Sequence, residues 1–108
     1  MKISTSDSVA NEVLRELASA MVGNAPMQSA HEGYSVILEE VDELWDEVKL
    51  NPRKNPQRNA MMRKEAIQVA AMAIRFVLDV CDKKVDEEQS GAMRGLPFGL
   101  MPSPNDED

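Results

Sequence analysis

The sequence predicts an all-α protein: an antiparallel helical bundle whose four-helix core is completed by homo-oligomerisation. The chain has 108 residues, which is the size of one domain. Apolar residues make up 43% of it but aromatic residues only 4%, and a core built from small and aliphatic side chains is typical of packed helices. Apolar positions recur at helical spacing in three segments, and no segment shows the alternation of a strand.

We expect the first helix to begin after a cap at Ser6 or Asp7 and to end near Met21. The apolar side chains of one face are Val9, Val13, Leu14 and Leu17. The segment Gly23-Asn24-Ala25-Pro26 then breaks the helix, because it combines glycine with proline. This helix is short and only moderately apolar.

The second helix is predicted from about Ser29 to Leu50, where Asn51-Pro52 ends it. Its apolar positions form a stripe about 120° wide. They are Tyr34, Ile37, Leu38, Val41, Leu44, Trp45 and Val48. Because Trp45 lies inside this stripe, we expect it to pack in the core. Acidic residues follow one edge of the stripe, at Glu40, Glu43 and Glu47.

The third helix is predicted from about Pro56 to Lys84, and its apolar arc covers well over half of its circumference. The arc includes Met62, Ala66, Ile67, Val69, Ala70, Ala73, Ile74, Phe76, Val77, Leu78 and Cys81. One neighbouring helix cannot cover so wide an arc, so we expect a subunit interface and a homodimer or homotetramer. The remaining narrow face carries Glu65, Gln68, Met72, Arg75 and Asp79.

Two regions are expected, a helical domain over residues 1–88 and an irregular or disordered tail over residues 89–108. The pattern dissolves after Asp86, and the segment from Gly91 to Asp108 contains three glycines and three prolines.

Composition excludes several classes of function. A net charge of −7 without a basic face argues against binding a nucleic-acid polymer. The single cysteine, Cys81, excludes a disulfide within the chain, which fits a reducing cytoplasm. No apolar run approaches the ~20 residues that cross a bilayer, and residues 1–8 lack the apolar core of a signal peptide. We therefore expect a cytoplasmic protein.

Four oxygen-bearing side chains form the main candidate site. Glu40 and Glu43 are neighbours at positions i and i+3 of a helix, where like charges repel. If the second and third helices pack antiparallel, Glu65 and the amide of Gln68 face this pair. Magnesium takes about six oxygen ligands and keeps several waters, so these side chains can hold Mg²⁺, or Mn²⁺ as an alternative. The competing interpretation is a solvated acidic surface.

The stretch from His31 to Val80 resembles the MazG-type nucleotide pyrophosphohydrolases, of the all-α NTP pyrophosphatase superfamily. The resemblance rests on His31-Glu32-Gly33-Tyr34, on Val36-Ile37-Leu38-Glu39-Glu40-Val41-Asp42-Glu43-Leu44-Trp45 and on Arg63-Lys64-Glu65-Ala66-Ile67-Gln68-Val69-Ala70-Ala71-Met72. The family pattern is Glu-Glu-x-x-Glu, a spacer, and Glu-x-x-Asp. It implies magnesium ligands at Glu40, Glu43, Glu65 and Gln68. It also implies hydrolysis of a nucleoside triphosphate to the monophosphate and pyrophosphate, including a role in the removal of unwanted dNTPs.

Gln68 departs from the family pattern, which has an aspartate at this place. A glutamine offers one neutral oxygen, so the affinity for a dication should be weaker. Two interpretations follow from it. Either the enzyme works with a reduced ligand set, or the chain is a catalytically weak or inactive relative that binds nucleotides.

Further roles follow from the resemblance. Glu39 is the candidate to orient or deprotonate the attacking water, with a plain surface acid as the alternative. Lys64 and Arg75 are candidates to bind the triphosphate, and salt bridges to neighbouring acids are their alternative. Asp79 either binds substrate or is exposed. His31 is a candidate contact for the base or sugar, as is Trp45 if it is not a core residue.

A different class of function is a helical interaction module without catalysis, in which the wide apolar face of the third helix and the apolar tail bind a protein. Gln68 favours this hypothesis. A di-iron bundle is excluded, because such sites need Glu-x-x-His pairs and His31, the only histidine, lacks a glutamate three residues before it.

Overall fold

The computed structural model describes residues 4–83, which fold as three α-helices and one short π-helical segment. The α-helices are α1 (Ser6–Gly23), α2 (Ala30–Val48) and α3 (Arg58–Phe76), and the π-helix η1 (Val77–Cys81) continues α3. No strand occurs among the described residues, so the predicted all-α class is confirmed. The predicted tail at residues 89–108 lies outside the described residues.

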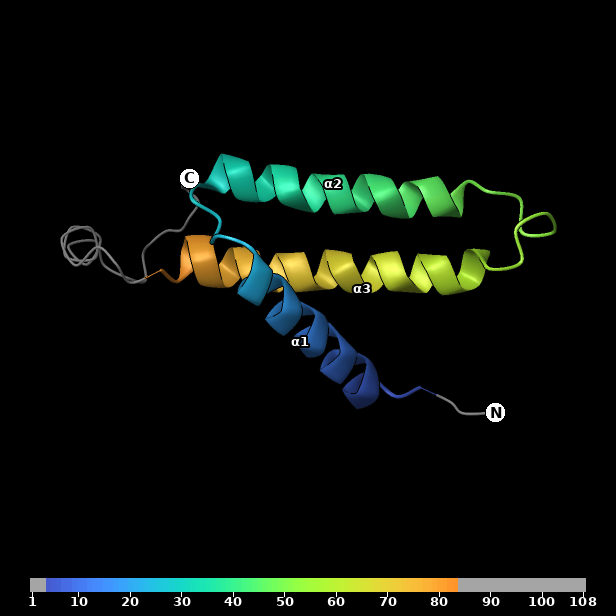
Figure 1. Ribbon diagram of the computed structural model, residues 1–108, viewed down its shortest axis with the longest axis horizontal. Helices are drawn as coiled ribbons and strands as arrows, with labels where there is room; N and C mark the ends of the chain where they lie inside the picture. Colours follow the sequence, from blue (N-terminus) through green and yellow to red (C-terminus); the bar gives the residue numbers. More distant parts are fainter. Residues whose placement is uncertain (1–3, 84–108) are drawn as a thin grey trace, which may run out of the picture.

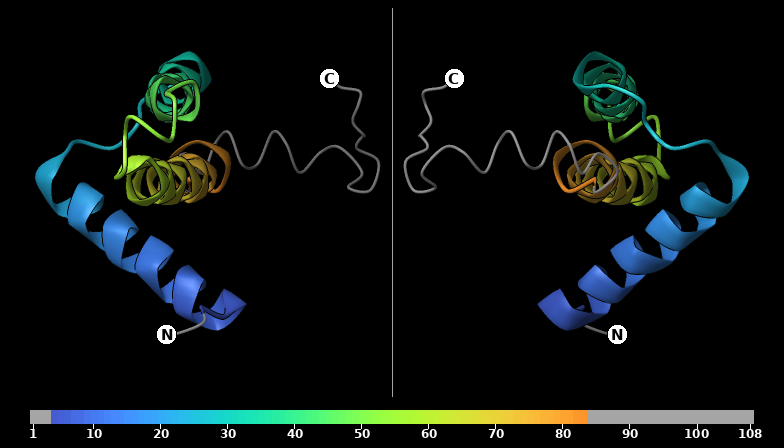
Figure 2. Two further views of the ribbon diagram at one scale, coloured as in Figure 1. Left: turned by 90° about the vertical axis from the view of Figure 1, so that its right-hand side faces the viewer. Right: turned by 90° about the vertical axis from the view of Figure 1, so that its left-hand side faces the viewer.

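Helix α3 is the centre of the molecule. Helix α2 runs antiparallel beside it along nearly its whole length, whereas α1 crosses α3 obliquely on another side (Figure 1). Views along the axis of α3 place it between the other two helices (Figure 2). The described part of the chain therefore contributes three α-helices, and the fourth helix of the predicted four-helix core is not among them.

The cap of α1 differs from the prediction. Thr5, rather than Ser6 or Asp7, is the N-cap residue, and its Oγ1 accepts a hydrogen bond of 3.1 Å from the backbone N–H of Ser8. The hydroxyl of Ser8 accepts in turn from the N–H of Thr5 at 3.1 Å. This reciprocal capping box satisfies two backbone donors at once. Ser6 and Asp7 already lie in the first turn of the helix, so neither of them is its cap.

The ends of α2 follow the sequence more closely. Ser29 caps the helix by accepting a hydrogen bond of 3.0 Å from the N–H of Glu32. At the other end, the guanidinium of Arg58 donates to the carbonyl oxygens of Glu47 at 3.2 Å and Val48 at 2.7 Å. The carbonyl of Glu47 also accepts a bond of 3.2 Å from the N–H of Leu50. A cation at a helix C-terminus in addition complements the helix dipole.

Helix α3 is shorter than predicted. Regular α-helix ends at Phe76, and the next turn is widened into a π-turn that closes with a bond of 2.8 Å from the N–H of Asp82 to the carbonyl of Val77. The predicted end at Lys84 lies outside the described residues. A single π-turn of five residues is too short to be recognised in the hydrophobic periodicity of the sequence.

The buried core lies where α1, the α1–α2 connection and α3 meet. Its members are Val13, Leu17, Met27, Ala71 and Met72. Helix α2 approaches this core closely at Gly33, where an added Cβ would lie only 2.6 Å from a ring carbon of Phe76. A residue without a side chain is therefore needed at this contact.

Much of the apolar stripe of α2 is exposed, which corrects the expectation that Trp45 packs in the core. Trp45 is 56% exposed and Tyr34 is 61% exposed, and Leu38 and Val41 are exposed on the same face. The reason is that α1 packs on α3 and leaves this side of α2 uncovered. The exposed apolar residues of α3 and η1 are Ile74, Val77 and Leu78. Among the described helices, none combines the length and the apolar character needed to span a membrane.

Candidate metal centre

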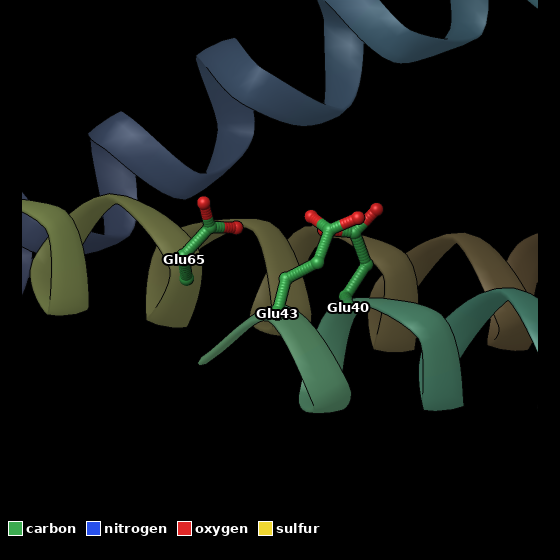
Figure 3. A group of neighbouring side chains, drawn as sticks. All are labelled: Glu40, Glu43 and Glu65. Carbon is green, nitrogen blue, oxygen red and sulfur yellow. The ribbon is translucent and has the colours of Figure 1, made fainter. Parts of the chain in front are cut away.

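Three glutamates from two helices meet at the α2–α3 interface. Glu40 and Glu43 lie one turn apart on α2, and Glu65 projects from the antiparallel α3 (Figure 3). One carboxylate oxygen of each lies within 4.8 Å of the others. The antiparallel packing predicted from the short connection thus brings together the three predicted carboxylates.

Two oxygens of this cluster are buried without a hydrogen-bond partner. Glu65 is only 8% exposed, although it is a carboxylate, and its Oε1 has no partner. The half-buried Glu40 also has an unpartnered Oε1. Buried polar atoms are nearly always hydrogen-bonded, and a buried carboxylate is costly unless a cation or a donor compensates it. The cluster is therefore incomplete as a purely structural feature.

Burial and mutual repulsion raise the pKa of two of the three carboxyl groups. Desolvation is the main cause of the raised pKa of Glu65, and the nearby Glu43 raises it further. Desolvation also raises the pKa of Glu40, together with the charges of Glu43, Glu65 and Glu39. A dication at this point would reverse the effect, because it stabilises the charged form of each group.

The donor set fits a hard divalent cation. Magnesium binds carboxylate oxygens at about 2.0–2.1 Å, so opposite ligands of one ion lie about 4.2 Å apart. Among three ligands of an octahedron at least two pairs are adjacent and lie about 2.9 Å apart, so the carboxylate oxygens, which now lie within 4.8 Å of one another, would move closer together by side-chain rotation. Three protein oxygens leave the other positions of an octahedron for water and phosphate oxygens.

Gln68 and Glu39 lie beside this cluster. Gln68 follows Glu65 by one turn of α3 and is half-buried. It lines two cavities of the protein. Glu39 is exposed and, with Glu40, lines the larger of these cavities, of about 620 Å³. The roles of Gln68 as a metal ligand and of Glu39 as a base stay predictions.

Arg75 and Asp79 form an ion pair that also binds the backbone of the α1–α2 connection. Arg75 is only 5% exposed, and its guanidinium donates to Asp79 at 3.1 Å and to the carbonyl of Ala25 at 2.6 Å. Asp79 also accepts a bond of 2.9 Å from the N–H of Met27. The predicted salt-bridge alternative for Arg75 is confirmed, and of the two alternatives for Asp79, substrate binding or exposure, exposure is wrong. Together they fasten the α1–α2 connection to the end of α3.

Lys64 and His31 are placed differently. Lys64 is exposed and lines a smaller cavity of about 380 Å³ between α1 and α3. His31 is exposed in the first turn of α2 and lines neither cavity. Lys64 therefore shares a cavity with Gln68, the neighbour of Glu65 on α3, whereas His31 lines neither cavity.

Helix α1 supplies residues that the sequence did not single out. Arg15 and Glu16 line the smaller cavity, and Glu16 lines the larger one as well. Glu12 forms a bidentate pair with Arg63 of α3, with both N–O distances at 2.7 Å. The pair holds α1 against α3. The only signal in the sequence was the polar face of the first helix, which does not show where that helix crosses its neighbour.

Comparisons with protein-family models, with curated proteins and with solved structures give no match to this chain. The resemblance to the MazG-type enzymes therefore stays a prediction. The glutamate cluster is the structural feature that supports a function.

Proposed function

We propose that the protein is a magnesium-dependent nucleoside triphosphate pyrophosphohydrolase, which converts a (d)NTP to the (d)NMP and pyrophosphate. The observation that carries the proposal is the buried carboxylate of Glu65, whose Oε1 has no hydrogen-bond partner, beside Glu40 and Glu43. Three converging carboxylates add nothing to stability by themselves, because burial and the neighbouring charges raise the cost of ionising Glu40 and Glu65. A bound dication removes that cost.

In this proposal the three glutamates hold the cation, and Gln68 supplies a fourth, neutral oxygen. When bound, Mg²⁺ polarises the phosphoryl oxygens and neutralises charge on the leaving pyrophosphate. Glu39 lies next to Glu40 at the mouth of the larger cavity, where its carboxylate can orient the water that attacks the α-phosphorus. Mn²⁺, with similar oxygen chemistry, is the alternative ion.

We also propose that a second copy of the chain completes the four-helix core. The support is the exposed row Tyr34, Leu38, Val41 and Trp45 on α2, which repeats at helical spacing and resembles a packing face rather than a solvated one. A contact between two copies through this face would bury the residues that α1 leaves uncovered.

The experiment is a pyrophosphate-release assay over a panel of NTPs and dNTPs, in magnesium and in chelator. We expect release in magnesium only, and its loss in Glu43→Gln. Asp42→Asn is the matched control, because Asp42 is exposed on α2 and belongs to no cluster. Full activity of Glu43→Gln would show that the site is assigned wrongly.

A second candidate is a nucleotide-binding or protein-interaction module of the same fold with little or no turnover, and Gln68 is the observation that favours it. Gln68→Asp separates the two. If only Gln68→Asp releases pyrophosphate, the natural chain is the weakened relative. If the wild type releases it and Gln68→Asp is merely faster, the natural chain is an enzyme with a reduced ligand set.

A further inference from the structure

Two cavities adjoin the glutamate cluster, and they differ in charge. The smaller one, of about 380 Å³, lies between α1 and the first half of α3. The larger one, of about 620 Å³, lies between α1, the α1–α2 connection, α2 and the second half of α3. Glu16 and Gln68 line both, so the cavities meet beside the position where the cation is proposed to bind.

Cations gather at the smaller cavity. Arg15, Arg63 and Lys64 line it, together with the carboxylates of Glu12 and Glu16. The bidentate pair between Arg63 and Glu12 uses one charge of each sign. In the part of the chain that the structure describes, the side chains of Arg15 and Lys64 form no hydrogen bond or ion pair, although the charge of Lys64 acts on Glu65 and that of Arg15 on Glu12.

The larger cavity is acidic. Four carboxylates line it, those of Glu16, Glu32, Glu39 and Glu40. Its one cation, Arg75, is already engaged by Asp79 and by the carbonyl oxygens of the α1–α2 connection. A polyphosphate entering this space would meet repulsion, whereas the hydroxyl and amino groups of a nucleoside are donors that carboxylates accept.

The walls of the larger cavity also suit a nucleoside. Met27 and Met72 belong to the buried core, and Val36 packs against it, so the lining of the cavity has an apolar part beside its carboxylates. Ligand pockets for small molecules have this combination of an apolar lining with a few polar groups, and a volume of about 300–1,000 Å³.

We propose that the two cavities fix the direction in which a nucleoside triphosphate lies: polyphosphate in the smaller cavity against Arg15 and Lys64, nucleoside in the larger one. This inference rests on the proposed function. It places the α-phosphate at the glutamate cluster, between the two spaces. It also replaces Arg75, predicted from the sequence to bind the triphosphate, with Arg15 of α1.

The test measures binding of two partial substrates by calorimetry in magnesium. Inorganic tripolyphosphate represents the tail, and the nucleoside monophosphate of the base that wild type hydrolyses best represents the other end. Arg15→Gln removes a cation from the smaller cavity, and Ser19→Trp fills the larger one from an exposed position on α1. Lys54→Gln is the control, because it changes net charge equally at an exposed site that lines neither cavity.

We expect Arg15→Gln to weaken tripolyphosphate binding about tenfold, the loss of one charge-assisted hydrogen bond, and to leave the monophosphate within about twofold. Ser19→Trp should do the reverse. Unchanged tripolyphosphate binding in Arg15→Gln, an equal loss in Lys54→Gln, or loss of tripolyphosphate in Ser19→Trp would each overturn the proposed direction while wild-type pyrophosphate release stands. Absence of release from the wild type would instead overturn the proposed function, and the direction with it.

Discussion

Glu43 of α2 and Glu65 of α3 bring carboxylate oxygens within 4.8 Å of each other across the helix interface, and Glu43 contributes to the raised pKa of Glu65. Glu65 is therefore an acid placed where burial and a neighbouring carboxylate disfavour its ionisation. This arrangement has a consequence for stability that can be measured without any knowledge of the substrate.

The first prediction concerns pH. The pKa values of Glu40 and Glu65 lie above the ordinary value of 4.5, so the folded protein binds protons more tightly than the unfolded chain. As pH rises from 4.5 through the raised pKa values, the free energy of unfolding should fall. In chelator, Glu65→Gln should match wild type near pH 4 and be more stable at pH 7, as measured by urea unfolding. If the free energies of unfolding of wild type and Glu65→Gln changed in parallel at all pH values, ionisation of Glu65 would not destabilise the fold.

The second prediction concerns the ion pair that holds the α1–α2 connection. Arg75→Met leaves Asp79 as a buried, unpaired charge and should reduce the free energy of unfolding by about 3–5 kcal/mol. Arg53→Met, at an exposed position in the α2–α3 connection, should change it by less than about 0.5 kcal/mol. Urea midpoints measure both, and equal effects of the two variants would contradict the structural role of Arg75.

The third prediction concerns the close approach at Gly33. Gly33→Ala should destabilise the fold by about 1–3 kcal/mol through overpacking against Phe76, more than the ~1 kcal/mol that alanine contributes to a helix. Gly23→Ala is the matched control, since an added Cβ there meets nothing within 4 Å. Phe76→Leu should rescue Gly33→Ala in thermal unfolding. A neutral Gly33→Ala would mean that the ring moves freely out of the way.

The fourth prediction concerns assembly. If a second copy covers the exposed row on α2, the protein should sediment as a dimer or tetramer, and Trp45→Glu should shift it toward the monomer because it buries a charge in that interface. Arg53→Glu changes charge in the same direction at an exposed position outside the row and serves as the control. A monomeric wild type at micromolar concentration would contradict the proposed assembly.

The sequence predicts the elements of this fold well, because periodicity and punctuation act locally. Helix α2 begins at Ala30, next to its predicted start at Ser29, and the helical spacing of Glu40 and Glu43 places them on one face whatever the tertiary structure is. Glu65 joins them because a short connection favours antiparallel packing. The three carboxylates of the candidate site thus follow from local rules and one simple tertiary rule.

The remaining features depend on where α1 crosses α3, which no local rule determines. That crossing leaves Trp45 exposed, encloses the two cavities and brings Arg15 beside the cluster. The backbone partners of Arg75 could not be predicted for a related reason. Besides Asp79, Arg75 binds two carbonyl oxygens of the α1–α2 connection, and a backbone acceptor leaves no signature in the sequence.

The most direct test of the central claim is a calorimetric titration of Mg²⁺ into wild type, Glu65→Gln and Asp42→Asn at neutral pH, with thermal unfolding measured in parallel. We expect one binding event in wild type and in Asp42→Asn, a stabilisation of about 2.7 kcal/mol at a hundredfold excess over Kd, and no binding in Glu65→Gln. Equal Mg²⁺ binding by Glu65→Gln and wild type, or none by either, would contradict the assignment of the glutamate cluster as the metal centre.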